Sequence, residues 1–129
     1  MSVFQWPIRI YWEDTDAGGL VYHANYVRFM ERARSEWMRA QTIDQSTLRS
    51  TTGLGFVVRD MQIDFLRPAR LDDELLVSVA VKEHRSASIL FDQEIVRGDA
   101  ALVRATVRVA CVNFDTMRPA LVPDGLFPA

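Results

Sequence analysis

The sequence of 129 residues has a single cysteine, Cys111, and no long run of apolar residues. One cysteine cannot form an internal disulfide or a cysteine-cluster metal site. No stretch reaches the ~18–20 apolar residues of a membrane span, and the first residues lack the basic start and apolar run of a signal peptide. We therefore expect a cytoplasmic protein with no membrane span and a buried, inert thiol at position 111.

An excess of basic residues is also absent, because 15 Lys and Arg stand against 17 Asp and Glu, for a net charge of −2. Dedicated DNA- or RNA-binding domains normally carry a basic excess, so we expect no nucleic-acid partner. The two histidines, His23 and His84, lie far apart in the sequence and do not have the spacing of a usual metal site. We expect no metal and no cofactor.

What remains is an ordinary globular composition, 49% hydrophobic and 25% charged, in a chain with room for one domain, residues 1–129. A helical period runs from about Ala24 to Gln41, where apolar residues recur at spacings of three and four. A shorter helix is expected after Asp44, because aspartate is a favoured N-cap residue.

Elsewhere the sequence alternates apolar and polar residues, which predicts strands. The expected strands cover residues 4–12, 61–65, 75–81, 87–95 and 101–111, and the last four are expected to form an antiparallel meander. The apolar face of such a sheet needs a cover, and the long helix is the candidate. The chain is therefore predicted to be α+β, with an antiparallel sheet of about five strands wrapped around one long helix. The proline-containing tail is expected to be irregular.

One charged residue departs from the strand pattern. Arg59 lies in phase with the apolar residues Met61 and Ile63, where a charge must be paired, bulged outward, or placed at an interface or a ligand. We favour an interface or active-site role for Arg59.

The segment that carries chemistry is the acidic, glycine-ending loop at residues 13–19, which precedes the long helix. A helix start offers unpaired backbone N–H groups and a partial positive charge, which suit a developing oxyanion. A carboxylate held opposite could attack a carbonyl or activate water. The same residues could instead form a plain turn in which Asp14 or Asp16 accepts hydrogen bonds from local amides.

The run Asp14-Thr15-Asp16-Ala17-Gly18-Gly19-Leu20-Val21-Tyr22-His23-Ala24-Asn25-Tyr26 resembles the signature of the 4-hydroxybenzoyl-CoA thioesterase family of hotdog proteins. It is most similar to the YbgC-type branch, the tol-pal-associated acyl-CoA thioesterases. The similarity covers roughly residues 6–119 and continues in four further runs: Glu31-Arg32-Ala33-Arg34-Ser35-Glu36, Phe56-Val57-Val58-Arg59, Asp64-Phe65-Leu66-Arg67-Pro68-Ala69-Arg70-Leu71-Asp72-Asp73, and Ala110-Cys111-Val112.

The resemblance implies a hotdog fold, acyl-CoA thioesterase activity and particular site residues. Asp16 takes the position of the catalytic carboxylate, as nucleophile or general base. His23 takes the position of the backbone oxyanion donor, and its imidazole is a candidate for assisting. Arg85, in the turn 84–86, takes the position of a basic residue near the CoA phosphates. Tyr22, beside the expected site mouth, and Arg59 are further substrate-binding candidates.

The family also binds CoA across a subunit interface, so the resemblance implies a homodimer or homotetramer with shared active sites. Two other functions stay open at this point. One is a hotdog hydratase or dehydratase acting on acyl thioesters, and the other is a non-catalytic scaffold associated with the cell envelope. The sequence does not specify the acyl group, nor whether the thioester is carried by CoA or by acyl carrier protein.

Overall fold

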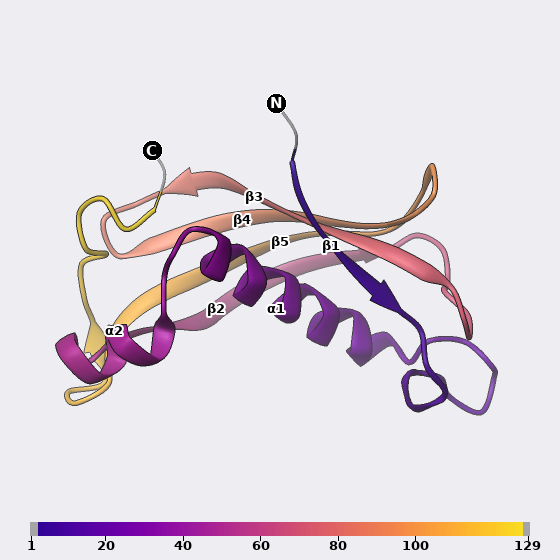
Figure 1. The fold of residues 1–129 in the computed structure, drawn as a ribbon, viewed down its shortest axis with the longest axis horizontal. Helices are drawn as coiled ribbons and strands as arrows, with labels where there is room; N and C mark the ends of the chain where they lie inside the picture. Colours follow the sequence, from indigo (N-terminus) through magenta and orange to yellow (C-terminus); the bar gives the residue numbers. More distant parts are fainter. Residues whose placement is uncertain (1–2, 128–129) are drawn as a thin grey trace.

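In the computed structural model, which describes residues 3–127, one curled antiparallel sheet wraps around one long helix (Figure 1). This is the expected α+β arrangement. The helices are α1 (His23–Ala40) and α2 (Gln45–Thr52), and a 3₁₀ turn covers Trp12–Asp14. The strands are β1 (Phe4–Arg9), β2 (Leu54–Phe65), β3 (Glu74–His84), β4 (Ser88–Arg97), β5 (Ala100–Asn113) and β6 (Arg118–Pro119).

The order of the strands differs from the expected four-strand meander. The main path is β1-β3-β4-β5-β2, with β6 paired to β5. Only β3, β4 and β5 form a meander, while β2 lies on the far side of β5 and is followed in sequence by β3. The connection 66–73 is long enough to cross the three strand spacings, about 14 Å, that separate β2 from β3. Strand β2 is thereby left at an edge of the sheet.

The core lies between α1 and the concave face of the sheet. The helix buries the residues that the period of three and four selected: Tyr26, Phe29, Met30, Ala33 and Trp37. The opposite wall is made by alternate residues of β3, β4 and β5, which are almost fully buried. Cys111 is one of them, and burial raises the pKa of its thiol. The expectation of a buried thiol is therefore confirmed.

A β-bulge in β2 corrects the expected phase of Arg59. The register with β5 shifts between Val58 and Asp60, so that one extra residue is inserted. Val58 lies opposite Val109 and Met61 opposite Val107, which places both on the concave face of the sheet. Arg59 is the inserted residue and is exposed. The sequence pattern assigned Arg59 to the buried face because an alternation of period two does not account for the inserted residue.

Three ends also differ from expectation. Strand β2 begins at Leu54, seven residues before the expected start at residue 61, because the bulge at Arg59 interrupts the alternation. Strand β1 ends at Arg9 rather than at residue 12, because the chain then enters the 3₁₀ turn. In the tail, the two-residue strand β6 pairs with the end of β5, where an irregular segment was expected. No helix within residues 3–127 is long and apolar enough to cross a membrane.

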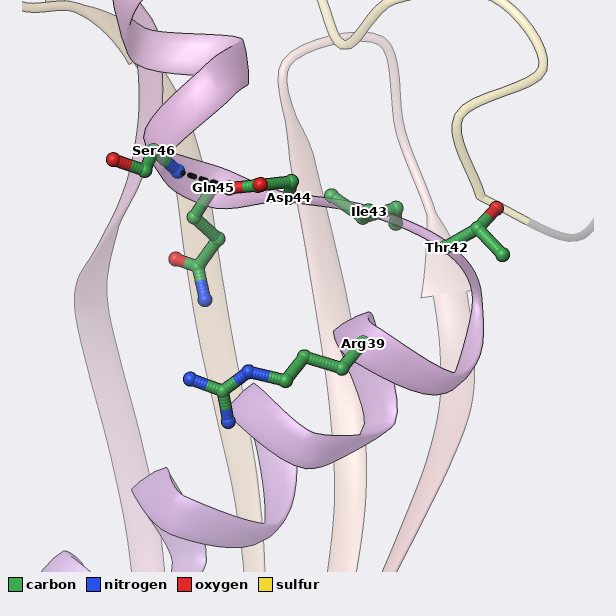
Figure 2. A pocket seen from close by; sticks show the side chains of 6 residues that line it. All are labelled: Arg39, Thr42, Ile43, Asp44, Gln45 and Ser46. Atoms are coloured by element: carbon green, nitrogen blue, oxygen red, sulfur yellow. Dashed lines mark hydrogen bonds between the residues drawn. The ribbon is translucent and has the colours of Figure 1, made fainter.

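Helix α2 begins as the sequence predicts, with Asp44 as its N-cap. The Asp44 carboxylate accepts hydrogen bonds from the backbone N–H groups of Ser46 at 3.0 Å and Thr47 at 3.1 Å. These bonds hold the pKa of Asp44 below its ordinary value. A hollow of about 490 Å³ lies at this turn, with the Arg39 side chain extending from α1 beside it (Figure 2). This hollow lies at the C-terminal end of α1, far from Asp16. The carboxylate that lines it belongs to Asp44 and already accepts the hydrogen bonds of the α2 cap.

Candidate active site

The loop between β1 and α1 is held in shape by Asp14, which is only 8% exposed. One oxygen of its carboxylate accepts from the backbone N–H of Tyr11 at 2.8 Å, and the other accepts from the Asn25 side-chain amide at 3.2 Å. The second bond ties the loop to the first turn of α1. Asp14 therefore acts as a structural acceptor within the loop, one of the two readings that the sequence left open.

Asp16 is exposed and lies at a tight turn of the same loop. Its Oδ1 accepts from the backbone N–H of Gly18 at 2.9 Å, and its carbonyl oxygen accepts from the N–H of Gly19 at 3.0 Å. Gly19 has a φ of 79°, a conformation that favours glycine. A Cβ on Gly18 would lie 3.2 Å from Asp16 Oδ1, so glycine at position 18 gives the carboxylate its room. Within residues 3–127, the Oδ2 oxygen of Asp16 accepts no hydrogen bond.

Helix α1 begins at His23 without a side-chain cap on its N-terminus. The preceding residue, Tyr22, is extended and offers no side-chain acceptor, and no hydrogen bond ties the backbone N–H of His23 to the described part of the chain. An uncapped helix start carries unpaired N–H donors and a partial positive charge. The first turn of α1 is therefore free to bind a negatively charged or polarised oxygen.

Asp16 and His23 line one hollow of about 320 Å³. Its other wall comes from the end of β2 and the residues after it: Phe65, Leu66, Arg67 and Pro68. Phe65 and Leu66 are 51% and 48% exposed, so a large apolar surface faces this space. The hollow thus combines a carboxylate, a free helix start and an apolar wall.

Tyr26 joins the two sides of this hollow. Its ring is buried against Phe65, with centroids 5.9 Å apart, and its hydroxyl accepts from the backbone N–H of Ala69 at 2.9 Å. Burial raises the pKa of the Tyr26 phenol, while the hydrogen bond from Ala69 opposes that rise. The tyrosine therefore fixes the segment after β2 against the start of α1.

The structure brings only some of the predicted site residues together. Asp16 and His23 share the hollow, whereas Tyr22 is 49% exposed and lies beside the His23 ring, with centroids 4.8 Å apart, outside the lining. Arg59 is exposed at the bulge of β2 and does not line the hollow either.

Arg85 belongs to the turn between β3 and β4, and this turn lies at the end of the sheet opposite the loop before α1 (Figure 1). Strand β5 gives the separation. Through β4, His84 is level with Val109 of β5, whereas Phe65 pairs with Val103, six residues away on the same strand. Six residues along a strand correspond to about 20 Å. Arg85 also forms an ion pair with Glu83, and this partner lowers the pKa of the Glu83 carboxyl. In a single chain, Arg85 therefore cannot reach a group held at Asp16.

Sequence reasoning missed the residues of the opposite wall. Phe65 looked like an ordinary strand residue, and Arg67-Pro68 looked like the end of a strand. The sequence signal that could have found them is the pair of consecutive large apolar residues, Phe65 and Leu66, directly before an arginine, and the structure shows that both are exposed. Their proximity to Asp16 depends on long-range packing of β2 beside α1.

Comparison with known proteins places this arrangement in a family. A model of the thioesterase-like superfamily matches residues 10–128. The chain belongs to the thioesterase-like superfamily. An acyl-CoA thioesterase YbgC of Haemophilus influenzae is 48% identical over 120 residues, which cover 93% of this chain and 88% of that protein. An acyl-CoA thioester hydrolase YbgC of Escherichia coli is 43% identical over 126 residues, covering 97% and 93% of the two chains.

A solved structure of the superfamily agrees at the level of the fold. The crystal structure of a probable thioesterase from Bartonella henselae superposes with a TM-score of 0.89 at 36% identity, covering 95% of this chain and all of that one. The expected membership of a hotdog thioesterase family is confirmed, and so is the sheet wrapped around one long helix. This superfamily member thus carries its carboxylate and its free helix start in one hollow.

Proposed function

We propose that this protein is an acyl-CoA thioesterase that hydrolyses an acyl-CoA to a free acid and CoA. The observation that carries the proposal is the shared hollow, in which the Asp16 carboxylate and the uncapped start of α1 face the same space. Two YbgC relatives named as acting on acyl-CoA, at 48% and 43% identity, support the reaction class.

In this reaction the thioester carbonyl lies between Asp16 and the first turn of α1. The backbone N–H of His23 donates to the carbonyl oxygen and stabilises the negative charge that develops there. Gly18 holds Oδ1 of Asp16, which leaves Oδ2 to react. The apolar surface of Phe65 and Leu66 receives the first part of the acyl group.

Two routes use the same carboxylate. In the first, Asp16 attacks the carbonyl carbon, the C–S bond breaks, the CoA thiolate leaves and takes a proton, and water hydrolyses the resulting mixed anhydride. In the second, Asp16 removes a proton from water, the hydroxide attacks the carbonyl carbon, the C–S bond breaks, and the leaving CoA thiolate takes the proton from Asp16. A single turnover in ¹⁸O-labelled water tests for the first route, because label in the Asp16 carboxylate identifies an anhydride that water opens at the aspartyl carbon. Label in the acid alone fits a general base and also an anhydride that water opens at the acyl carbon.

The test is thiol release from short-chain, long-chain and aromatic acyl-CoAs by wild type and Asp16→Asn. Asparagine keeps the shape and removes the charge, so we expect kcat to fall by about 10²- to 10⁴-fold. The matched control is Glu13→Gln, which removes one charge from an exposed residue of the same loop. Equal turnover by wild type and Asp16→Asn would refute the proposal.

A hydratase or dehydratase is the second candidate, because such enzymes also pair a histidine with an acid. Enoyl absorbance distinguishes the two activities on one substrate. If a 2-enoyl-CoA is hydrated faster than its thiol is released, hydration is the principal reaction. A scaffold function would be supported instead by two results together: wild type hydrolyses no thioester, and a partner protein that binds wild type also binds Asp16→Ala.

We also propose that two copies pair through β2. This strand has twelve residues, lies at the edge of the sheet and pairs only with β5 among the described strands. Val57 and Val58 are 37% and 48% exposed on it, and long exposed edge strands favour pairing with another chain. Antiparallel pairing of β2 with its copy would extend the sheet.

Light scattering, which measures the molar mass in solution, tests the pairing of two copies. The mass of a monomer would exclude both the pairing through β2 and a shared active site. A tetramer, the cytoplasmic location, the tol-pal association and the substrate-binding roles of Tyr22, Arg59 and Arg85 stay predictions. The same holds for the choice between CoA and acyl carrier protein as the carrier.

A further inference from the structure

A second hollow of about 300 Å³, here called the α1–β2 groove, lies farther along the helix and the strand that also border the candidate active site. Its lining includes Val27, Arg34 and Met38 of α1 and Phe56, Val58 and Met61 of β2. Val27 directly follows Tyr26 of the first hollow, and Met61 lies on the same concave face as Phe65. The two hollows therefore follow one another along one seam.

The groove is mostly apolar but contains a buried arginine. Arg34 is only 6% exposed, and one guanidinium nitrogen donates to the Gln93 side-chain oxygen at 2.9 Å. Within residues 3–127, no carboxylate oxygen lies within 4.0 Å of this guanidinium. Burial lowers the pKa of Arg34, and nearby Glu31 opposes this. A buried charge held only by a neutral amide is costly unless a further acceptor reaches it.

Within residues 3–127 the Arg34 guanidinium forms no hydrogen bond other than that to Gln93, its nitrogens without a partner are not fully buried, and Arg34 lines the groove. A guanidinium presents its donors in a planar fork that matches a carboxylate. Glu31 also lines the groove but is exposed and forms no ion pair with Arg34 among the described residues. The groove therefore combines a largely apolar lining with one buried cationic group that has no carboxylate partner among the described residues.

The distance along the helix suits an extended acyl chain. His23 begins α1 and Arg34 lies eleven residues later, a rise of about 16 Å. A thioester carbonyl at the helix start would thus place a medium-length acyl chain along Val27 and Met61, with its far end beside Arg34. A plain methyl end there would displace water from the guanidinium without replacing its hydrogen bonds.

We propose that the α1–β2 groove holds the acyl group and that Arg34 is a specificity-determining residue that favours acyl chains ending in a carboxylate. The inference rests on the proposed thioesterase activity and names the substrate class of the same site, a dicarboxylic acyl-CoA. The apolar walls bind the methylene chain, and Arg34 binds the distal carboxylate.

The experiment compares two substrates of equal carbon number, lauroyl-CoA and the mono-CoA thioester of dodecanedioic acid. The readout is the ratio of kcat/KM for the dicarboxylic substrate to kcat/KM for lauroyl-CoA. We expect wild type to favour the dicarboxylic substrate and Arg34→Met to lower the ratio about ten- to a hundredfold, the range for a charge-assisted hydrogen bond. Arg28→Met, on an exposed arginine of the same helix outside the groove, is the control and should keep the wild-type ratio.

Glu31→Gln provides a second variant at an exposed position, so it tests the proposal even where Arg34→Met does not fold. Removing this negative charge from the groove should raise the ratio, and an unchanged ratio would overturn the proposal. Equal ratios for wild type and Arg34→Met, with both substrates hydrolysed, would overturn it while leaving the thioesterase function standing. Loss of dimer in Arg34→Met with the ratio unchanged would also overturn it and identify the partner copy as the occupant.

A binding measurement separates this inference from the proposed activity. Calorimetry with free dodecanedioate needs no turnover, and we expect Arg34→Met to bind it at least about tenfold more weakly than wild type. If wild type hydrolyses neither thioester, the proposed function is refuted. The binding measurement still tests Arg34 in that case, because equal affinities of wild type and Arg34→Met for dodecanedioate would overturn its proposed role.

Discussion

Replacing Tyr26 by phenylalanine should destabilise the protein, although it removes a single oxygen atom. The Tyr26 hydroxyl is the acceptor for the backbone N–H of Ala69, a residue with 0% exposure. Phenylalanine keeps the ring contacts with Phe29 and Phe65 and opens almost no cavity. The cost is therefore that of one buried, unsatisfied N–H, about 1–3 kcal/mol.

Urea denaturation measures this cost. With a slope of about 2 kcal/mol per M, the unfolding midpoint of Tyr26→Phe should fall by roughly 0.5–1.5 M at neutral pH. Tyr22→Phe is the control, because the Tyr22 side chain is 49% exposed and its loss should leave the midpoint unchanged. If Tyr26→Phe were as stable as Tyr22→Phe, the bond to Ala69 could not fix the wall of the site.

The pH dependence provides a further check on the same bond. Burial raises the pKa of Tyr26 in the folded state above its value in the unfolded chain. A group with a raised folded pKa contributes its full stability below the unfolded value, about pH 10, and loses it as pH rises through the folded value. The gap between wild type and Tyr26→Phe should therefore be constant from neutral pH to about pH 9 and narrow above pH 10.

Three further substitutions test the loop and the helix cap. Gly18→Ala would place a methyl group against the Asp16 carboxylate, so we expect kcat for thiol release to fall by about tenfold or more with stability nearly unchanged. Gly19→Ala meets no atom within 4 Å but strains the backbone, so it should lower stability more than Gly18→Ala does. Asp44→Ala should lower the urea midpoint at neutral pH. Because hydrogen bonds depress the folded pKa of Asp44, its charge contributes above pH 4, and the gap to wild type should shrink as pH falls below that value.

The features that sequence could predict are local ones. The helical period found α1 to within a residue at each end, and Asp44 marked the start of α2. Alternation found the strands and their buried faces, because the period depends only on which side of the sheet is covered. It cannot name the neighbouring strand, so the position of β2 beside β5 was not predictable. Nor could it detect the inserted residue that turns Arg59 outward.

The candidate site divides in the same way. Asp16 and His23 lie seven residues apart on one loop and helix start, so a local signature contains both. Phe65 and Arg67 come to the same hollow only because the end of β2 packs beside the start of α1. The distance between Arg85 and Asp16 within one chain has the same origin, since the strand register places the turn at residue 85 at the far end of the sheet.

Gln93 shows how a polar residue in an apolar phase can indicate function. Its side-chain amide donates to the carbonyl oxygens of Met30 at 3.1 Å and Ser78 at 3.3 Å, while its oxygen accepts from Arg34. The Met30 carbonyl lies within α1, and the second lone pair of a helical carbonyl is free to accept such a bond. Gln93 is thus fully satisfied although 2% exposed, and its burial costs little. Replacing either Gln93 or Arg34 alone would leave a buried polar group without its partner, so the two belong to one network. That network fixes one nitrogen of the guanidinium against the sheet, beside the groove that we propose for the acyl group.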